Sequence, residues 1–316
     1  MFAYIVRRLA TTLPLVVVVS IIAFSLVYLL PGDAAMAVLG EQLATDEDLY
    51  QTLREEMGLD QPVPIQYLNW ARKAVTGDFG MSPRLGLPVR QVIEERIVPT
   101  VELAIVALLL ALMVALPVGV LSAAKPNSRL DVIGTLFALS GVAIPHFWLG
   151  IMMMFVLAVW LRWLPPSGYV SPFVDLGESL RLMIMPGLTL ATGLTAVITR
   201  QVRSALIEVL QQEYIVTARA KGLSEQMVVL RHALKNALVP VVTVIGLQTG
   251  RLFGGAVVVE VIFSIPGMGR LVVDAIAYRE LSIVQAVIMV MALAVLVANL
   301  LTDVIYAYLD PRIRTA

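Results

Sequence analysis

Few side chains in this sequence are suited to covalent or metal chemistry. Its 316 residues include no cysteine, and the two histidines, His146 and His232, stand far apart in the chain. The absence of cysteine excludes disulfides, thiolate metal sites and cysteine nucleophiles. A lone imidazole with no carboxylate or second histidine beside it is more often a polar packing contact than a nickel ligand. We therefore predict no catalytic residue and no metal site.

Two charged residues stand inside an apolar stretch between residues 237 and 263. They are Arg251 and Glu260, and a charge at the centre of a membrane helix costs about 2.5–3.5 kcal/mol. Nine residues at about 100° each place these side chains on opposite faces of one helix, so they cannot neutralise each other. Each charge therefore needs its own polar partner. Small residues on the same helix are predicted to clear one face for close packing: Gly246, Gly250, Gly254 and Gly255.

The composition places these residues in a membrane protein. Hydrophobic residues make up 59% of the chain and charged residues 15%, with a mean hydropathy of +0.87, which is too apolar for a soluble domain. Crossing about 30 Å of hydrocarbon at about 1.5 Å per residue takes about 20 residues. About six runs are long enough, at residues 9–30, 100–123, 133–161, 182–199, 237–263 and 284–309. The predicted fold class is an all-α membrane protein with about six transmembrane helices.

Basic residues between these runs fall on one side of the membrane, which the positive-inside rule assigns to the cytoplasm. Both termini are then cytoplasmic. The residues concerned are Arg7, Arg8, Lys125, Arg129, Arg200, Arg203, Arg219, Lys221, Arg231, Lys235, Arg312 and Arg314.

The first apolar run also has features of a signal peptide. Arg7 and Arg8 precede it, and Ala35-Met36-Ala37 follows it like a cleavage site. Since the run is longer than the about 7–15 residues of such a segment, we expect it to remain as an anchor.

A polar segment from Tyr214 to Pro240 follows the fourth run. Gly222 is predicted to split it into two short helices, because a side chain there would clash or require a left-handed backbone. Ser224 is placed to cap the second helix with its hydroxyl. We predict a projecting cytoplasmic elbow. The alternative is an ordinary basic loop that only fixes topology.

This segment resembles the cytoplasmic docking loop, or EAA loop, of ATP-binding-cassette (ABC) importer permeases of the dipeptide, oligopeptide and nickel branch. The matching text is TARAKGL at 217–223, HALKNAL at 232–238, and Pro240. Val216 replaces the usual Glu, and the gap from Gly222 to Pro240 is longer than in other permeases; both departures are typical of this branch. The resemblance implies that the ATPase-docking residues are Tyr214, Thr217, Ala218, Arg219, Ala220, Lys221, Gly222, Leu223, His232, Asn236 and Pro240.

The similarity extends over essentially the whole chain, with LPGD at 30–33, LDQP at 59–62, GDFG at 77–80 and LDPR at 309–312. Ala34 departs from the usual Pro, and RELS at 279–282 stands where Arg-Asp-Tyr-Pro is common. The resemblance implies a type I ABC importer permease fold. Residues 1–98 would form an N-terminal transmembrane helix and a large extracytoplasmic loop. Residues 99–316 would form a five-helix permease core that carries the docking loop.

The long acidic loop at residues 31–99 allows two interpretations. It is either a solvated cover, or a surface for a binding protein or a lid over the translocation path. The functional interpretation is motivated by its length and by Tyr67 and Trp70.

Pro145 is predicted to break the third helix, and broken helices in transporters usually line a cavity. Arg251 is expected to point into the translocation path, with a structural tie to a partner subunit as the alternative. Glu260 opens a turn that either shapes a gate or is only structural. The predicted path and gate residues are Pro145, His146, Phe147, Arg251, Glu260, Pro266 and Gly267.

The resemblance also implies the partners: a homologous second permease, two ATPase subunits and a periplasmic or lipid-anchored solute-binding protein. No Gly-x-x-x-x-Gly-Lys-Ser/Thr loop occurs, so Mg-ATP is expected on the partner ATPases and no cofactor on this chain. Membrane lipids are expected neighbours, and nucleic acid is not expected as a partner. The expected location is the bacterial inner membrane.

Di- and oligopeptides are the first expectation for the cargo, and nickel chelates, glutathione, opines and oligosaccharides remain open. Two other classes of membrane protein are alternatives. A secondary transporter would need inverted repeats and ion-coupling carboxylates, and an intramembrane enzyme would need a nucleophile–base or metal constellation.

Overall fold

The computed structural model describes residues 2–29, 47–56 and 58–309. Several predicted features lie outside the described residues: the LPGD motif with Ala34, the Ala35-Met36-Ala37 site, and the chain end from Asp310 with Arg312 and Arg314.

The described chain is built from helices, as predicted. Four are long and apolar enough to cross a membrane: α5 (Val89–Ala124), α8 (Leu176–Leu210), the stretch Glu225–Phe263 that contains α11 (Leu234–Phe263), and α13 (Leu281–Leu309). A fifth candidate is broken and comprises α6 (Arg129–Ala143), α7 (His146–Met153) and the π-helix η2 (Met154–Trp160). The shorter apolar helix α1 (Phe2–Ser25) ends in the 3-10 turn η1 (Leu26–Leu29). These elements correspond to the six predicted apolar runs.

The remaining elements are short. They are α3 (Glu47–Glu56), α4 (Val63–Val75), α9 (Glu213–Ala220), α10 (Glu225–Met227), the π-helix η3 (Val228–Ala233), α12 (Met268–Ala277), and the antiparallel pair β1 (Met81–Ser82) and β2 (Leu87–Pro88). In that pair Met81 lies opposite Pro88, and Ser82 opposite Leu87.

The chain forms two compact units. The first comprises residues 1–5, 99–265 and 297–316, and the second comprises residues 6–98 and 266–296. The division into 1–98 and 99–316 stays a prediction.

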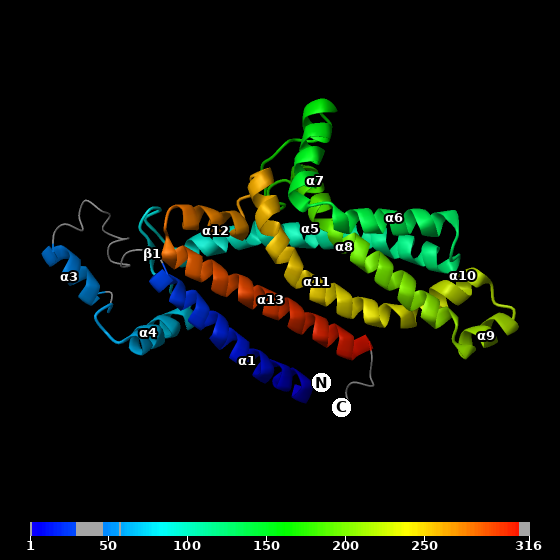
Figure 1. The fold of residues 1–316 in the computed structure, drawn as a ribbon, viewed down its shortest axis with the longest axis horizontal. Helices are drawn as coiled ribbons and strands as arrows, with labels where there is room; N and C mark the ends of the chain where they lie inside the picture. Colours follow the sequence, from blue (N-terminus) through cyan, green and yellow to red (C-terminus); the bar gives the residue numbers. More distant parts are fainter. Residues whose placement is uncertain (1, 30–46, 57, 310–316) are drawn as a thin grey trace. The chain divides into compact units, whose positions relative to one another are not determined.

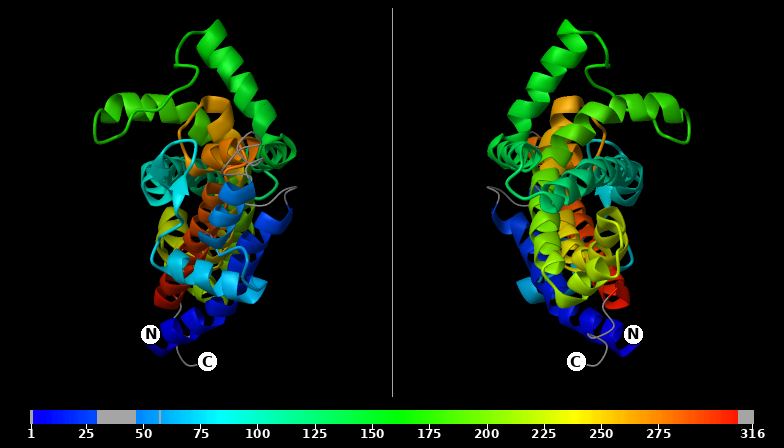
Figure 2. Two further views of the ribbon diagram at one scale, coloured as in Figure 1. Left: turned by 90° about the vertical axis from the view of Figure 1, so that its left-hand side faces the viewer. Right: turned by 90° about the vertical axis from the view of Figure 1, so that its right-hand side faces the viewer.

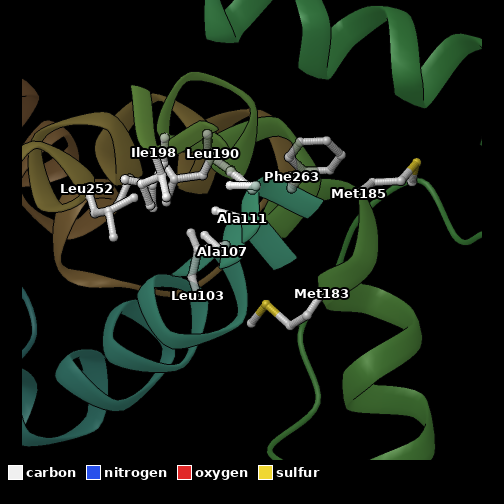
Figure 3. Packing of buried hydrophobic residues seen from close by; sticks show 14 of the residues in the cluster. Leu103, Ala107, Ala111, Met183, Met185, Leu190, Ile198, Leu252 and Phe263 are labelled. Atoms are coloured by element: carbon white, nitrogen blue, oxygen red, sulfur yellow. The ribbon is translucent and has the colours of Figure 1, made fainter. Parts of the chain in front are cut away.

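Small residues on α5 form the centre of the first unit. Leu103, Ala107, Ala111 and Ala115 recur every four residues and are fully buried, so they share one face of the helix. Figure 3 shows three of them packed among side chains of α8 and α11 such as Leu190, Ile198 and Leu252. Because lipid tails are as apolar as these side chains, close contact rather than removal from water stabilises such packing.

The break between α6 and α7 lies where Pro145 predicted it. α6 ends at Ala143, and Ile144 and Pro145 are extended, with ψ of 122° and 135°. Pro145 has no backbone N–H and disfavours helical geometry in the residue before it. The two helices are bent by 104°, and α7 leaves the direction of α6 (Figure 2).

The glycines of α11 do not form the single packing face that we predicted. A Cβ on Gly246 would overlap the side chain of Thr302 in α13, whereas one on Gly255 would lie 2.9 Å from Leu190 in α8. No neighbouring atom lies within 4 Å of a Cβ on Gly254. The prediction of one packing face was wrong, because Gly246 packs against α13, Gly255 packs against α8, and Gly254 faces open space.

In the second unit, the aromatic residues of the acidic loop are anchors. The ring of Phe24 lies 5.6 Å from that of Tyr67 and 5.8 Å from that of Trp70. Trp70 Nε1 donates to Gln285 Oε1 at 3.1 Å, and Tyr67 shares a 2.8 Å hydrogen bond with Ser20. These residues therefore tie α4 to α1 and α13. Tyr67 and Trp70 are therefore not evidence for a binding surface. The interpretation of the loop as a binding surface stays a prediction.

The unusual RELS segment also has a structural role in the second unit. Glu280 is buried and accepts hydrogen bonds from Ser82 Oγ and from Arg84 Nε, the latter at 2.9 Å. The Arg84 guanidinium lies 4.0 Å from the ring centre of Tyr278. Glu280 thus holds the β1–β2 turn to the start of α13.

We expect Gly246→Ala to destabilise the protein by about 1–3 kcal/mol, because the added methyl group overlaps Thr302 and forces α11 from α13. The measurement is the thermal unfolding midpoint of the purified protein in detergent. Gly254→Ala is the matched control and should leave the midpoint unchanged or slightly raised, because alanine favours the helix. Equal midpoints for the two variants would contradict the close contact.

Candidate functional site

The predicted elbow is present at the ends of α8 and α11 (Figure 1). α9 ends at Ala220, and Gly222 takes a left-handed φ of +80°. No atom lies within 4 Å of a Cβ built on Gly222. Of the two reasons predicted for a glycine here, the left-handed backbone is confirmed and the clash is not, so the backbone conformation alone favours glycine.

The second half of the elbow differs from the prediction. α10 and η3 continue directly into α11, so this half is the first part of a long helix rather than a separate short one. Ser224 occupies the N-cap position, with ψ of 145°, but its side chain makes no capping hydrogen bond. The capping prediction was therefore wrong in its hydroxyl contact and right in its position.

A buried apolar cluster fixes the elbow to the helix that precedes it. Ile215 and Ala218 of α9 pack with Val228 and Ala233 of η3 and with Leu206 of α8. These residues are buried. The elbow is therefore packed against the end of α8 and the start of α11.

Polar contacts close the elbow across its turn. Arg219 donates to both carboxylate oxygens of Glu225, at 3.1 and 2.7 Å, and these hydrogen bonds raise the pKa of Arg219 above its ordinary value. Asn236 Nδ2 donates to the Tyr214 hydroxyl at 2.8 Å. Three of the predicted docking residues, Tyr214, Arg219 and Asn236, thus stabilise the elbow itself. Sequence reasoning missed Glu225, whose only signal is its place at the start of the second helix.

The outer side of the elbow remains open. Tyr214, Val216, Met227 and Leu230 are large apolar side chains left exposed there. The predicted docking residues Thr217, Arg219, Ala220, Lys221, Gly222, Asn236 and Pro240 are exposed as well, Leu223 and His232 are half-buried, and Ala218 is buried. Several large apolar side chains exposed among polar residues are typical of a protein interaction surface.

An ion pair supports the helix that carries the elbow. Arg203 of α8 donates to Asp131 of α6 through Nε at 2.6 Å and through a terminal nitrogen at 2.8 Å. Asp131 Oδ2 also accepts from the backbone N–H of Asn127, a residue with a left-handed φ of 62°. From the sequence alone Arg203 is predicted only to mark the cytoplasmic side, since 72 residues separate it from Asp131.

A cavity of ≈ 200 Å³ lies beside the break in the third span. It contains two of the predicted path residues, His146 and Arg251, together with Gln248, which was not predicted. His146 Nδ1 lies 3.1 Å from the backbone oxygen of Thr189. The remaining lining residues are Gly141, Val142, Ile144, Leu190, Gly193, Leu194, Val197 and Leu252.

The other predicted path residues lie elsewhere. Glu260 is fully buried, and its Oε1 accepts a 2.7 Å hydrogen bond from Thr100 of α5. Glu260 and Arg251 therefore have different neighbours, as predicted: Glu260 contacts Thr100, whereas Arg251 lines the cavity. Phe147 is exposed on α7. Pro266 and Gly267 belong to the second unit, where Gly267 is the N-cap of α12.

Comparison with known proteins gives consistent matches. A sequence profile described as "Binding-protein-dependent transport system inner membrane component" matches residues 115–315, and the corresponding N-terminal profile matches residues 1–88. The dipeptide transport system permease protein DppB of Alkalihalophilus pseudofirmus is 39% identical over 334 residues, covering 99% of this chain and 100% of that protein. The oligopeptide transport system permease protein AppB of Bacillus subtilis is 40% identical over 316 residues, with 99% of each chain covered.

A third relative is the glutathione transport system permease protein GsiC of Escherichia coli K12, 38% identical over 314 residues with 99% of each chain covered. Among solved structures, an inward-facing MetNI methionine ABC transporter matches with a TM-score of 0.58 at 19% identity, covering 70% of this chain and 97% of that chain. An amino acid ABC transporter matches with a TM-score of 0.52 at 12% identity, covering 69% and 94%. At these identities the structural matches show a shared fold alone.

We expect Glu260→Ala to cost about 2–4 kcal/mol, because it leaves a cavity and removes the acceptor of the Thr100 hydroxyl. Glu260→Gln should cost less, since the amide keeps both the volume and an acceptor oxygen. Thermal unfolding in detergent measures both. Glu94→Ala is the control, because the Arg90–Glu94 pair is exposed and such pairs contribute little. If Gln and Ala proved equally damaging, the hydrogen bond to Thr100 would not be what Glu260 provides.

Proposed function

Because this chain belongs to the family of binding-protein-dependent transport system inner membrane components, we propose that it forms half of the pathway through which an ATP-driven importer moves di- and oligopeptides. The chain is a multi-pass membrane protein with the fold of type I ABC importer permeases. Its role as a permease follows from the family and from full-length similarity to transport permeases.

Peptide as the cargo is supported by the names of the relatives. They are described as dipeptide, oligopeptide and glutathione permeases, each at 38–40% identity over nearly the whole chain. Glutathione is itself a short peptide with free carboxylates, so the three names share one chemical class. The proposed cargo is therefore a short peptide that a solute-binding protein delivers.

The elbow is the proposed coupling element. Its exposed apolar side chains and cations form a surface for a separate ATPase subunit, while its buried side continues the core of α8 and α11. In the proposed assembly, this chain pairs with a homologous permease in the bacterial inner membrane, and both termini face the cytoplasm. Two ATPase subunits hold Mg-ATP below the elbows, and membrane lipids surround the helices.

Closure of the ATPase pair would draw the elbows together and move α8 and α11 with them, because the Ile215 cluster packs the elbow against α8 and the Arg203–Asp131 pair ties α8 to α6. Such a movement switches a pathway between inward-open and outward-open packings. Pro145, His146 and Arg251 are the proposed path residues in the first unit. Phe147, Glu260, Pro266 and Gly267, which do not line the cavity, keep a proposed role in the gate.

Replacing Gly222 tests the docking surface. Gly222→Trp adds a large side chain where this chain leaves open space, so the permease should fold while ATPase co-purification and uptake are lost. Gly86→Trp is the matched control: Gly86 has a φ of +66° and also nothing within 4 Å of a Cβ, but it lies in the β1–β2 turn. The backbone strain is then similar in both variants. Normal co-purification and uptake with Gly222→Trp would overturn the docking role.

The cargo class is tested by uptake into proteoliposomes that contain the permease pair and ATPases. Labelled trialanine should accumulate only when both ATP and the cognate binding protein are supplied. Nickel–histidine chelates and maltotriose serve as competitors of other classes. If trialanine did not accumulate with ATP and the binding protein present, or if a competitor of another class reduced its uptake more than unlabelled peptide did, peptide as the cargo would be contradicted.

A further inference from the structure

The cavity beside Pro145 combines a few polar groups with an apolar wall. Gln248 and Arg251 stand three residues apart on α11, so they project from one side of the helix, and His146 begins α7 opposite them in the lining. Gln248 is only 8% exposed. Sites that orient small ligands typically place a small number of polar groups in such apolar surroundings.

Arg251 provides a positive charge at the wall of the cavity. None of the ion pairs within the described ranges involves Arg251. A guanidinium presents planar paired donors that match both oxygens of a carboxylate. α7 also begins at His146 without a side-chain cap, so its first backbone N–H groups add positive potential at the same wall.

His146 adds the opposite kind of group. The backbone oxygen of Thr189 can only accept, so the contact at 3.1 Å requires a proton on Nδ1. In the neutral ring, Nε2 is then an acceptor. The Gln248 amide oxygen is a second acceptor in the lining. The cavity therefore offers donors for an anion and acceptors for a neighbouring N–H group.

We infer that this cavity binds the C-terminal end of a peptide, with Arg251 holding the carboxylate and His146 and Gln248 accepting from the amide N–H beside it. A volume of ≈ 200 Å³ is smaller than a site for a whole drug-sized ligand, which fits an end group rather than an entire peptide. This inference rests on the proposed peptide import and specifies what the path recognises. It also gives Gln248 a role in specificity.

A direct binding measurement tests this site independently of which cargo the complex imports. The membrane complex without its binding protein is placed in nanodiscs, and saturation-transfer NMR follows acetate, N-acetylalaninate and N-acetylalanine amide. N-acetylalaninate should bind better than the other two. Arg251→Gln should weaken both anions by about tenfold or more, since a hydrogen bond to a charged group is lost. His146→Phe should weaken N-acetylalaninate while leaving acetate unchanged, because acetate has no N–H group.

Arg181→Gln is the matched control, because Arg181 is an exposed cation of α8 outside the cavity, and it should leave all three ligands unchanged. Anion binding that Arg251→Gln does not alter would overturn the inference. So would an equal loss of acetate and N-acetylalaninate in His146→Phe, since that result indicates a structural role for the ring.

Uptake of trialanine and of its C-terminal amide completes the test. The uptake of each peptide by Arg251→Gln is divided by its uptake by the wild type, so that the contribution of the binding protein cancels. This ratio should fall below one for trialanine and stay near one for the amide, which lacks the carboxylate. If the wild-type complex imports no peptide but still binds N-acetylalaninate through Arg251, peptide import fails and the carboxylate site stands. If wild-type peptide uptake is normal and Arg251→Gln changes neither N-acetylalaninate binding nor trialanine uptake, the site is contradicted and peptide import stands.

Discussion

Close contact between helix surfaces is the interaction on which the first unit depends. In lipid, burying an apolar side chain gains little, so helices associate where small residues let their backbones approach. The alanines of α5, Gly141 beside Thr192 and Gly246 beside Thr302 provide such approaches. The few polar contacts, such as Thr100–Glu260 and Arg203–Asp131, are added at fixed points within this packing. The cavity and the elbow are both positioned by helices that are held in this way.

Local chemistry explains which parts of the fold the sequence predicts. The length of the apolar runs predicts the spans. Pro145 predicts the break because proline lacks a backbone donor, and Gly222 predicts the reversal because glycine readily adopts the positive φ found there. The elbow was found by resemblance in addition to these signals. One detail at the start of the second elbow helix was predicted wrongly. At Ser224 the sequence indicates a capping hydroxyl, but the backbone adopts the N-cap conformation without using it.

Contacts between distant residues account for what the sequence could not show. Ser82 and Glu280 are separated by 198 residues, and Trp70 and Gln285 by 215. No periodicity relates such positions, so an aromatic pair in the acidic loop resembled a binding surface until its partners were known. The same reason explains why Gln248 was overlooked beside Arg251. A glutamine in an apolar helix carries no charge signal, and only the packing of α6, α7 and α8 around α11 shows that it faces a cavity.

The π-helix η3 has a consequence for how the chain changes over evolutionary time. A π-turn accommodates an inserted residue inside a helix without breaking it, and η3 lies in the long interval between Gly222 and Pro240. Removing one residue there would restore α-helical winding while the helix after it keeps its orientation, because the wide turn takes up that residue locally. A deletion elsewhere in the same helix would instead rotate everything after it by about 100° relative to the elbow. The π-turn is therefore the place in this interval where one residue can be lost while α11 keeps the helices it packs against.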